Sequence, residues 1–185
     1  HFRKFRSSQI SSNLAFAALI VLGQSIPFSA HAEAPSLQTD GPVIHLADNL
    51  DEEASLGWCI DTEGRGLSDQ LHAHSCKPEG DDVLFTYAAE TGMIASATYD
   101  GLCMAYNDPE NADNPFGLVS CDEGDPAQQF VYDDASMEMR LASDPAQCVT
   151  VAEIIDDAGP YQSRDLILAP CGALEASFKQ WVIQR

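Results

Sequence analysis

The sequence predicts an all-β fold built from three copies of one unit, and two observations carry this prediction. Six cysteines form three consecutive pairs, whose first members stand 44 and 45 residues apart. An aromatic residue follows the second cysteine of every pair by nine or ten positions. The pairs are Cys59 and Cys76, Cys103 and Cys121, and Cys148 and Cys171, and the aromatic residues are Phe85, Phe130 and Trp181.

Apolar residues recur at alternate positions in every unit, a spacing typical of β-strands because alternate side chains share a face. Such residues stand five and three positions before each second cysteine: Leu71 and Ala73, Phe116 and Leu118, Leu166 and Leu168. Each unit is expected to contain a strand, a turn, a strand ending in the second cysteine, a polar loop and a strand with the aromatic residue. Helical periodicity is weak, and Gly, Pro, Asn and Asp are too frequent for long helices.

The third unit is the longest. Its cysteines stand 23 residues apart, against 17 and 18 in the other units. The extra residues are most easily placed in the polar stretch from Ile154 to Gln162, which contains Gly159 and Pro160.

The first 32 residues have the order of a secretory signal peptide. Arg3, Lys4 and Arg6 precede an apolar run over 14–23, and Ala30-His31-Ala32 has the form of a cleavage site. The apolar run is about half of the roughly 20 residues that a membrane-spanning helix needs, so no stable membrane anchor is expected. We therefore expect a cleaved signal over residues 1–32, a flexible segment over 33–40, and one domain over 41–185.

The expected mature chain is strongly acidic. It has six Lys and Arg against 29 Asp and Glu, a formal charge of −23. Such a surface repels nucleic acid and anionic lipid, so neither is an expected partner. A chain of this length has room for a single core.

Cysteines in an exported chain are expected to form disulfides. A bridge inside each unit is the most economical pairing for a repeat and would contribute about 3 kcal/mol in the chain-entropy model. A metal site remains an alternative, because His72, His74 and Cys76 alternate on one strand and such ligands suit zinc or copper.

The three units resemble the repeats of the ricin B-type lectin family, a β-trefoil. The residues that carry the resemblance are Cys59-Ile60-Asp61 in the first unit, Gln128-Gln129-Phe130 in the second, and Lys179-Gln180-Trp181 in the third. The resemblance implies repeats over about 41–90, 91–134 and 135–185. A closed barrel of such strands also leaves no free sheet edge.

In that family, an Asp after the first cysteine and an Asn before the last strand hold sugar hydroxyls, while an aromatic ring stacks on the sugar. The resemblance places Asp61 and Asp82 at the two polar positions, and His74 at the stacking position with His72 beside it. Because Leu71 and Ala73 are expected in the core, both histidines should point to the opposite, pocket side.

The other two units lack these residues. Ala105, Val119 and Ala127 occupy the three positions in the second unit, and Thr150, Ala169 and Phe178 occupy them in the third. One sugar site, in the first unit, is therefore expected.

Enzymatic motifs are missing from the sequence: it has no Gly-x-Ser-x-Gly, no phosphate-binding Gly-rich loop and no His-Glu-x-x-His. The acidic loop from Asp108 to Asn114 lacks the spacing of an EF-hand. No cofactor and no metal are expected.

The sequence thus favours an exported, secreted or periplasmic, non-catalytic protein that binds a glycan or glycoconjugate. The alternative is a protein-interaction trefoil, such as a protease inhibitor or a toxin-delivery subunit. The insertion around Tyr161 favours this alternative.

Overall fold

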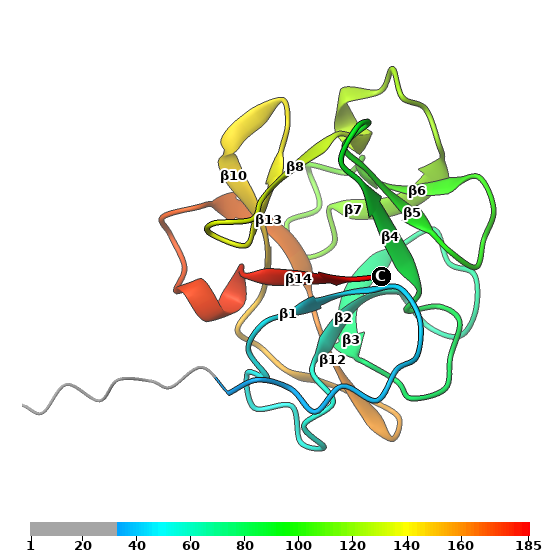
Figure 1. Ribbon diagram of the computed structural model, residues 1–185, viewed down its shortest axis with the longest axis vertical. Helices are drawn as coiled ribbons and strands as arrows, with labels where there is room; N and C mark the ends of the chain where they lie inside the picture. The colour runs from blue at the N-terminus through cyan, green and yellow to red at the C-terminus, as the bar shows by residue number, and fades with distance from the viewer. Residues whose placement is uncertain (1–32) are drawn as a thin grey trace, which may run out of the picture. The chain divides into compact units, whose positions relative to one another are not determined.

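The structure is a computed structural model that describes residues 33–185, so the expected signal peptide lies outside the described residues. Strands dominate this part of the chain (Figure 1). Their bounds are β1 (Val43–Leu46), β2 (Trp58–Thr62), β3 (Leu71–Ser75), β4 (Phe85–Ala88), β5 (Met93–Ser96), β6 (Leu102–Tyr106), β7 (Phe116–Ser120), β8 (Phe130–Asp133), β9 (Glu138–Leu141), β10 (Asp144–Val151), β11 (Asp156–Ala158), β12 (Tyr161–Arg164), β13 (Leu166–Pro170) and β14 (Trp181–Gln184). Two single-turn 3-10 helices, η1 (Pro126–Gln128) and η2 (Ala176–Phe178), are far too short to cross a membrane.

The same four-strand unit occurs three times, as the sequence predicts. The units are β1 to β4, β5 to β8, and β9, β10, β13 and β14. In each unit the two middle strands form an antiparallel hairpin of five residue pairs, β2 with β3, β6 with β7, and β10 with β13. The all-β, threefold architecture expected from the cysteine spacing is confirmed.

The outer strands of the three units close a six-stranded barrel. β1 pairs with β14, β4 with β5, and β8 with β9. Three equivalent backbone hydrogen bonds join these pairs, from Phe85 N to Pro42 O at 3.0 Å, Phe130 N to Gly92 O at 2.8 Å, and Trp181 N to Met137 O at 2.7 Å. The aromatic residues recognised in the sequence therefore stand where one strand pair meets the next.

One hydrophobic core fills the barrel and the space under the hairpins. Phe85, Phe130 and Trp181 are at most 1% exposed and belong to this core. Of the six alternating apolar residues, all are buried except Leu168, which packs against the core while partly exposed. A single hairpin of this length would not be stable alone, because it cannot bury its apolar side chains. The three units bury them together in one shared core.

The three disulfides lie inside the units, linking Cys59 to Cys76, Cys103 to Cys121, and Cys148 to Cys171. No cysteine among the described residues is free. The alternative of a metal site with Cys76 is therefore wrong, because its sulfur is bonded to Cys59 and cannot act as a thiolate ligand.

The segment over residues 33–40, expected to be flexible, is instead held against the domain. Ser36 N donates to Ser55 O at 2.7 Å, and Thr39 Oγ1 donates to Lys77 O at 2.8 Å. Pro35 packs so closely on Gly57 that a Cβ there would lie 2.7 Å from the proline Cβ, and Gly57 also has a φ of +81°. Only glycine fits this approach and this backbone conformation without strain.

The extra residues of the third unit form the hairpin β11–β12, and this insertion crosses to the first unit. β12 pairs with β3, placing Ser163 opposite His74 and Arg164 opposite Ala73. The insertion thus extends the sheet of a different repeat.

Arg164 anchors this insertion. The residue is 4% exposed, and its guanidinium donates to Ala152 O, Glu153 O and Leu50 O over 2.7–2.9 Å. It also lies 4.7 Å above the Trp58 ring, a cation–π geometry. A buried guanidinium with three carbonyl partners holds the hairpin in one position.

Candidate functional site

The structure brings together the four residues predicted from the sequence. Asp61 lies on β2 directly opposite His72 of β3, His74 is two positions further on, and Asp82 lies in the loop before β4. The Asp61 Oδ2 atom is 3.8 Å from His72 Nε2 and 3.7 Å from His74 Nδ1. Strand alternation explains the grouping, because Leu71 and Ala73 turn into the core and the histidines turn away from it.

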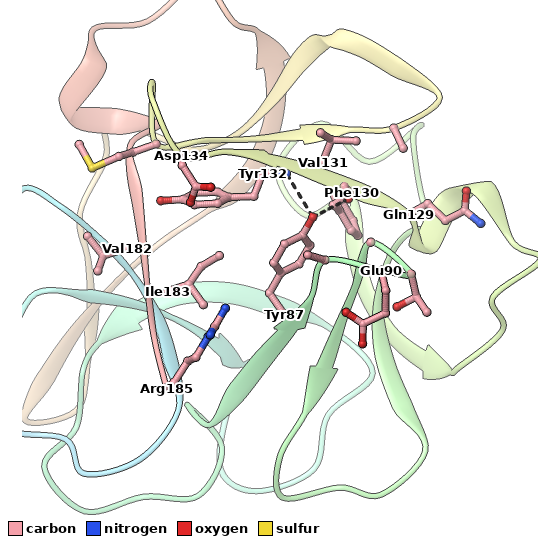
Figure 2. Close-up of a pocket in the computed structure, with 15 residues that line it drawn as sticks. Tyr87, Glu90, Gln129, Phe130, Val131, Tyr132, Asp134, Val182, Ile183 and Arg185 are labelled. Carbon is pink, nitrogen blue, oxygen red and sulfur yellow. Dashed lines mark hydrogen bonds between the residues drawn. The ribbon is translucent and has the colours of Figure 1, made fainter.

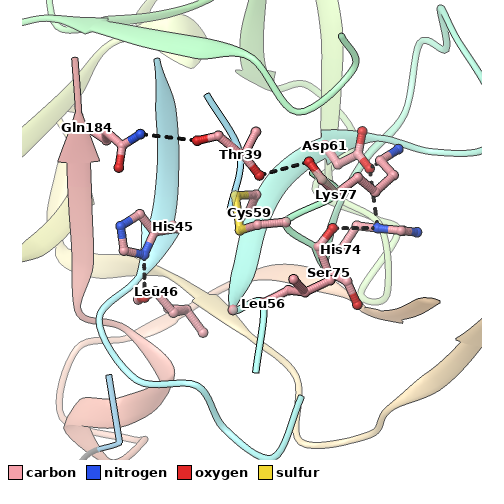
Figure 3. Close-up of a disulfide and its surroundings, with 12 residues drawn as sticks. Thr39, His45, Leu46, Leu56, Cys59, Asp61, His74, Ser75, Lys77 and Gln184 are labelled. Carbon is pink, nitrogen blue, oxygen red and sulfur yellow. Dashed lines mark hydrogen bonds and ion pairs between the residues drawn. A yellow bond between two sulfur atoms is a disulfide. The ribbon is translucent and has the colours of Figure 1, made fainter. Parts of the chain in front are cut away.

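Lys77, which the sequence analysis did not identify, connects the two predicted acids. Its ammonium lies 3.0 Å from Asp61 Oδ2 and 2.8 Å from Asp82 Oδ2. Figure 3 shows Lys77, Asp61 and His74 beside the Cys59–Cys76 disulfide. Lys77 directly follows Cys76 in the sequence, but only the fold shows that its side chain turns back to β2.

Burial separates the carboxylates from solvent. The Asp61 side chain is 0% exposed, and neither of its carboxylate oxygens has a hydrogen-bond partner among the described residues, although Oδ2 forms the ion pair with Lys77. The Asp82 side chain is 11% exposed. A buried carboxylate is costly unless it is paired, so the Lys77 ammonium is what makes Asp61 tolerable at this position.

A cavity of about 310 Å³ opens in front of this cluster. Its walls are His72, His74 and Lys77 from the first unit, Gly64 and Arg65 from the β2–β3 turn, and residues 158–161 from the insertion. Neither Asp61 nor Asp82 lines it.

Tyr161 supplies the aromatic wall of the cavity. Its ring lies 5.6 Å from the His74 ring in an edge-to-face arrangement, and the His72 and His74 rings are 5.3 Å apart. The insertion that was expected to favour a protein partner therefore contributes to the predicted site itself. The unusual length of the third unit was the only signal of this in the sequence.

Burial lowers the pKa of the His74 imidazole, although its hydrogen bond to Ser75 and the charge of Asp61 partly oppose the shift. The ring is therefore neutral at pH 7. His74 Nδ1 lies 2.9 Å from Ser75 O, and a carbonyl only accepts, so Nδ1 carries the proton. The other ring nitrogen, Nε2, is then left as an acceptor.

Lys77 remains charged. Burial alone would lower the pKa of its ammonium, but the hydrogen bond to Asp82 and the pairing with Asp61 raise it above the ordinary value. An ammonium has three protons and this one pairs with two carboxylates, so one donor is left for a ligand.

A second cavity, of about 710 Å³, lies elsewhere, and none of the predicted residues lines it (Figure 2). Tyr87, Tyr132 and Ile183, which hold equivalent positions in the three units, all border it, so it lies on the axis that relates them. Both tyrosine hydroxyls are already bonded to backbone carbonyls, Tyr87 to Phe130 O at 3.2 Å and Tyr132 to Trp181 O at 2.7 Å. The two hydroxyl groups therefore connect β4 to β8 and β8 to β14 at this end of the barrel.

Potential metal ligands converge at one place in residues 33–185. The only group of three potential ligands there consists of Glu138, Cys148 and Cys171, and both cysteines are in a disulfide. The acidic side chains of Asp108, Glu110 and Asp113 are exposed and do not converge as such a group.

In sequence, the chain matches no protein-family profile and no curated protein. Solved structures do resemble it. The C-terminal half of an earthworm R-type lectin, solved with GalNAc, matches with a TM-score of 0.55 and 14% identity, over 77% of this chain and 96% of that chain. An agglutinin from Abrus precatorius matches with a TM-score of 0.53 and 12% identity, over 77% of this chain and 45% of that chain.

GalNAc-T7, solved with UDP, GalNAc and Mn²⁺, matches with a TM-score of 0.50 and 13% identity. The match covers 69% of this chain but only 20% of the GalNAc-T7 chain. At these identities, structural similarity identifies the fold. The chain is a β-trefoil of three repeats, each closed by an internal disulfide, and it shares this fold with the earthworm R-type lectin.

Proposed function

We propose that this chain is a non-catalytic saccharide-binding domain with one site, in the cavity between the first repeat and the insertion. The observation that carries the proposal is the convergence of His72, His74 and Lys77 with the Tyr161 ring around a cavity of about 310 Å³. A cavity of this volume suits one or two sugar rings, and a flat aromatic wall suits the C–H face of a pyranose.

The polar groups of the cavity are suited to hydroxyls. His74 Nε2 accepts a hydrogen bond, and the free Lys77 proton and the Arg65 guanidinium donate. Asp61 and Asp82 then act through Lys77, which they hold in place, and do not contact the sugar themselves.

The structural neighbours favour this class of ligand. The earthworm R-type lectin was solved with GalNAc, and a mutant of its C-terminal domain, with a TM-score of 0.50 to this chain, was solved with 6'-sialyllactose. Three intact disulfides favour an oxidising compartment, and with the signal-like residues 1–32 they support a secreted or periplasmic location.

Replacing Tyr161 with alanine tests the site. A glycan array should identify a saccharide ligand, and calorimetry at pH 7.5 should show at least a tenfold loss of affinity for Tyr161→Ala. The matched control is Ile154→Ala, which truncates a 70% exposed residue just before the same hairpin and outside the cavity. Absence of any saccharide ligand, or equal affinity of the two variants, would refute the proposal.

A protein partner is the second candidate, favoured by the exposed apolar residues Leu67 and Ile154, which are 60% and 70% exposed. An affinity column of this protein separates the two functions, because free sugar elutes a glycoprotein bound through a lectin site. A partner held through Leu67 and Ile154 would instead be lost from a Leu67→Ser/Ile154→Ser column and would ignore free sugar.

A further inference from the structure

The cavity at the first repeat differs in charge from the rest of the molecule. From residue 33 onward the chain has six Lys and Arg against 29 Asp and Glu. Two of those six, Arg65 and Lys77, line this one cavity together with two histidines, and no carboxylate lines it. A wall drawn at random from so acidic a surface would be rich in Asp and Glu.

The carboxylates nearby are turned away from any ligand. Asp61 is fully buried, and both it and Asp82 are paired with the Lys77 ammonium. A neutral sugar held by an acidic site donates its hydroxyl protons to carboxylates, but here the acceptors lie behind the cation. The charged groups that line the cavity, the Arg65 guanidinium and the Lys77 ammonium, are hydrogen-bond donors.

The Arg65 guanidinium has hydrogen-bond donors available for a ligand. The residue is exposed in the β2–β3 turn, and no carboxylate in the described part of the chain lies within 4.0 Å of its side chain. A guanidinium is planar and can bind a carboxylate or sulfate through two parallel hydrogen bonds. The remaining Lys77 proton adds a further donor to the same cavity.

We infer that the saccharide recognised in this cavity is anionic, carrying a carboxylate or a sulfate ester held by Arg65 and Lys77. The inference rests on the proposed saccharide-binding function and adds the charge of the ligand to it. Long-range attraction does not explain such a preference, because the chain as a whole is acidic and repels anions. The local donors must overcome this repulsion.

Calorimetry with matched sugar pairs tests the inference on the intact, disulfide-bonded protein. The pairs are galactose and galacturonic acid, and N-acetylglucosamine and its 6-sulfate, with sodium sulfate as a non-sugar probe. The charged member of at least one pair should bind about tenfold or more tightly, since hydrogen bonds to charged groups are the stronger ones. The carboxylate and sulfate pairs show which group is preferred.

The variants assign the preference to the cavity. Arg65→Gln should reduce the affinity for the charged sugar about tenfold and leave the neutral sugar unchanged, with a smaller salt dependence. Arg185→Gln removes the same charge from an exposed residue outside this cavity and should change neither.

The binding data separate a failure of the anionic preference from a failure of the proposed saccharide site. Equal binding of charged and neutral sugars, lost in Tyr161→Ala, would leave the saccharide site intact and overturn the anionic preference. No binding of any sugar would overturn both. A charge preference that persists in Arg65→Gln, or sulfate binding as tight as that of the charged sugar, would also overturn the inference.

Discussion

Replacing Lys77 with methionine tests whether the ammonium is what allows Asp61 to be buried. Methionine keeps most of the aliphatic stem and removes only the charge and its hydrogen bonds. In the native protein, the ammonium lies 3.0 Å from Asp61 and 2.8 Å from Asp82, and the Asp61 side chain is 0% exposed. The variant leaves this carboxylate without a counter-charge.

Removing one partner of a buried ion pair costs about 3–5 kcal/mol, mainly because the other charge is left unpaired. The cost falls mainly on Asp61, whose side chain is 0% exposed, whereas the Asp82 side chain keeps 11% exposure. We therefore expect the free energy of unfolding to fall by about 3 kcal/mol, at the lower end of that range. In an Asp61→Asn background the uncharged amide needs no cation, and the same Lys77→Met change should cost about 1 kcal/mol.

Urea unfolding without reductant measures both values. The fluorescence of Trp58 and Trp181 reports the transition, since both rings are fully buried in the native state. A loss below about 1 kcal/mol for Lys77→Met would refute the reasoning, as would an equal loss in the two backgrounds.

Three further changes probe other parts of the structure. Burial lowers the pKa of the His45 and His74 imidazoles, so the unfolded chain binds more protons than the folded chain below about pH 6.5. The free energy of unfolding should therefore fall from pH 7 toward pH 5. In urea titrations, a His45→Asn/His74→Gln variant should lose the part of this pH dependence that the two histidines cause. Arg164→Met leaves three carbonyl oxygens without their donor, so the free energy of unfolding should fall by about 2–4 kcal/mol in the same assay. The variant should also bind saccharide more weakly. An unchanged free energy of unfolding would contradict the anchoring role of Arg164. Replacing Cys148 and Cys171 by alanine opens a loop with a sequence separation of 23 residues and should cost about 3 kcal/mol; a loss below about 1 kcal/mol would contradict the loop-closure argument.

The fold could be predicted because its signals are local and repeated. The spacing of the cysteines, with the alternating apolar residues around Leu71, Phe116 and Leu166, marks the same strands in every unit. Strand alternation also determines which face a side chain occupies, so His72 and His74 could be assigned from the sequence alone to the face that lines the cavity. Three copies of one pattern leave few other ways to bury the aromatic residues.

Interactions between distant segments could not be predicted. The hairpin that carries Tyr161 reaches the first repeat because β12 pairs with β3, which precedes it by more than 80 residues. Nothing in the sequence of either strand identifies its partner, because backbone hydrogen bonds are the same for every residue. The order of residues 33–40 arises in the same way, from the contacts that Pro35 and Thr39 make with the first unit.

The sequence alone was sufficient for the three-unit β architecture and the disulfide pairing, because these depend on patterns within each unit. The tertiary structure decided which groups face the cavity. Asp61, predicted to hold a sugar hydroxyl, is buried behind Lys77, and the insertion of the third repeat forms the opposite wall. Burial and charge pairing depend on how the repeats pack together, and the sequence of one repeat does not contain that information.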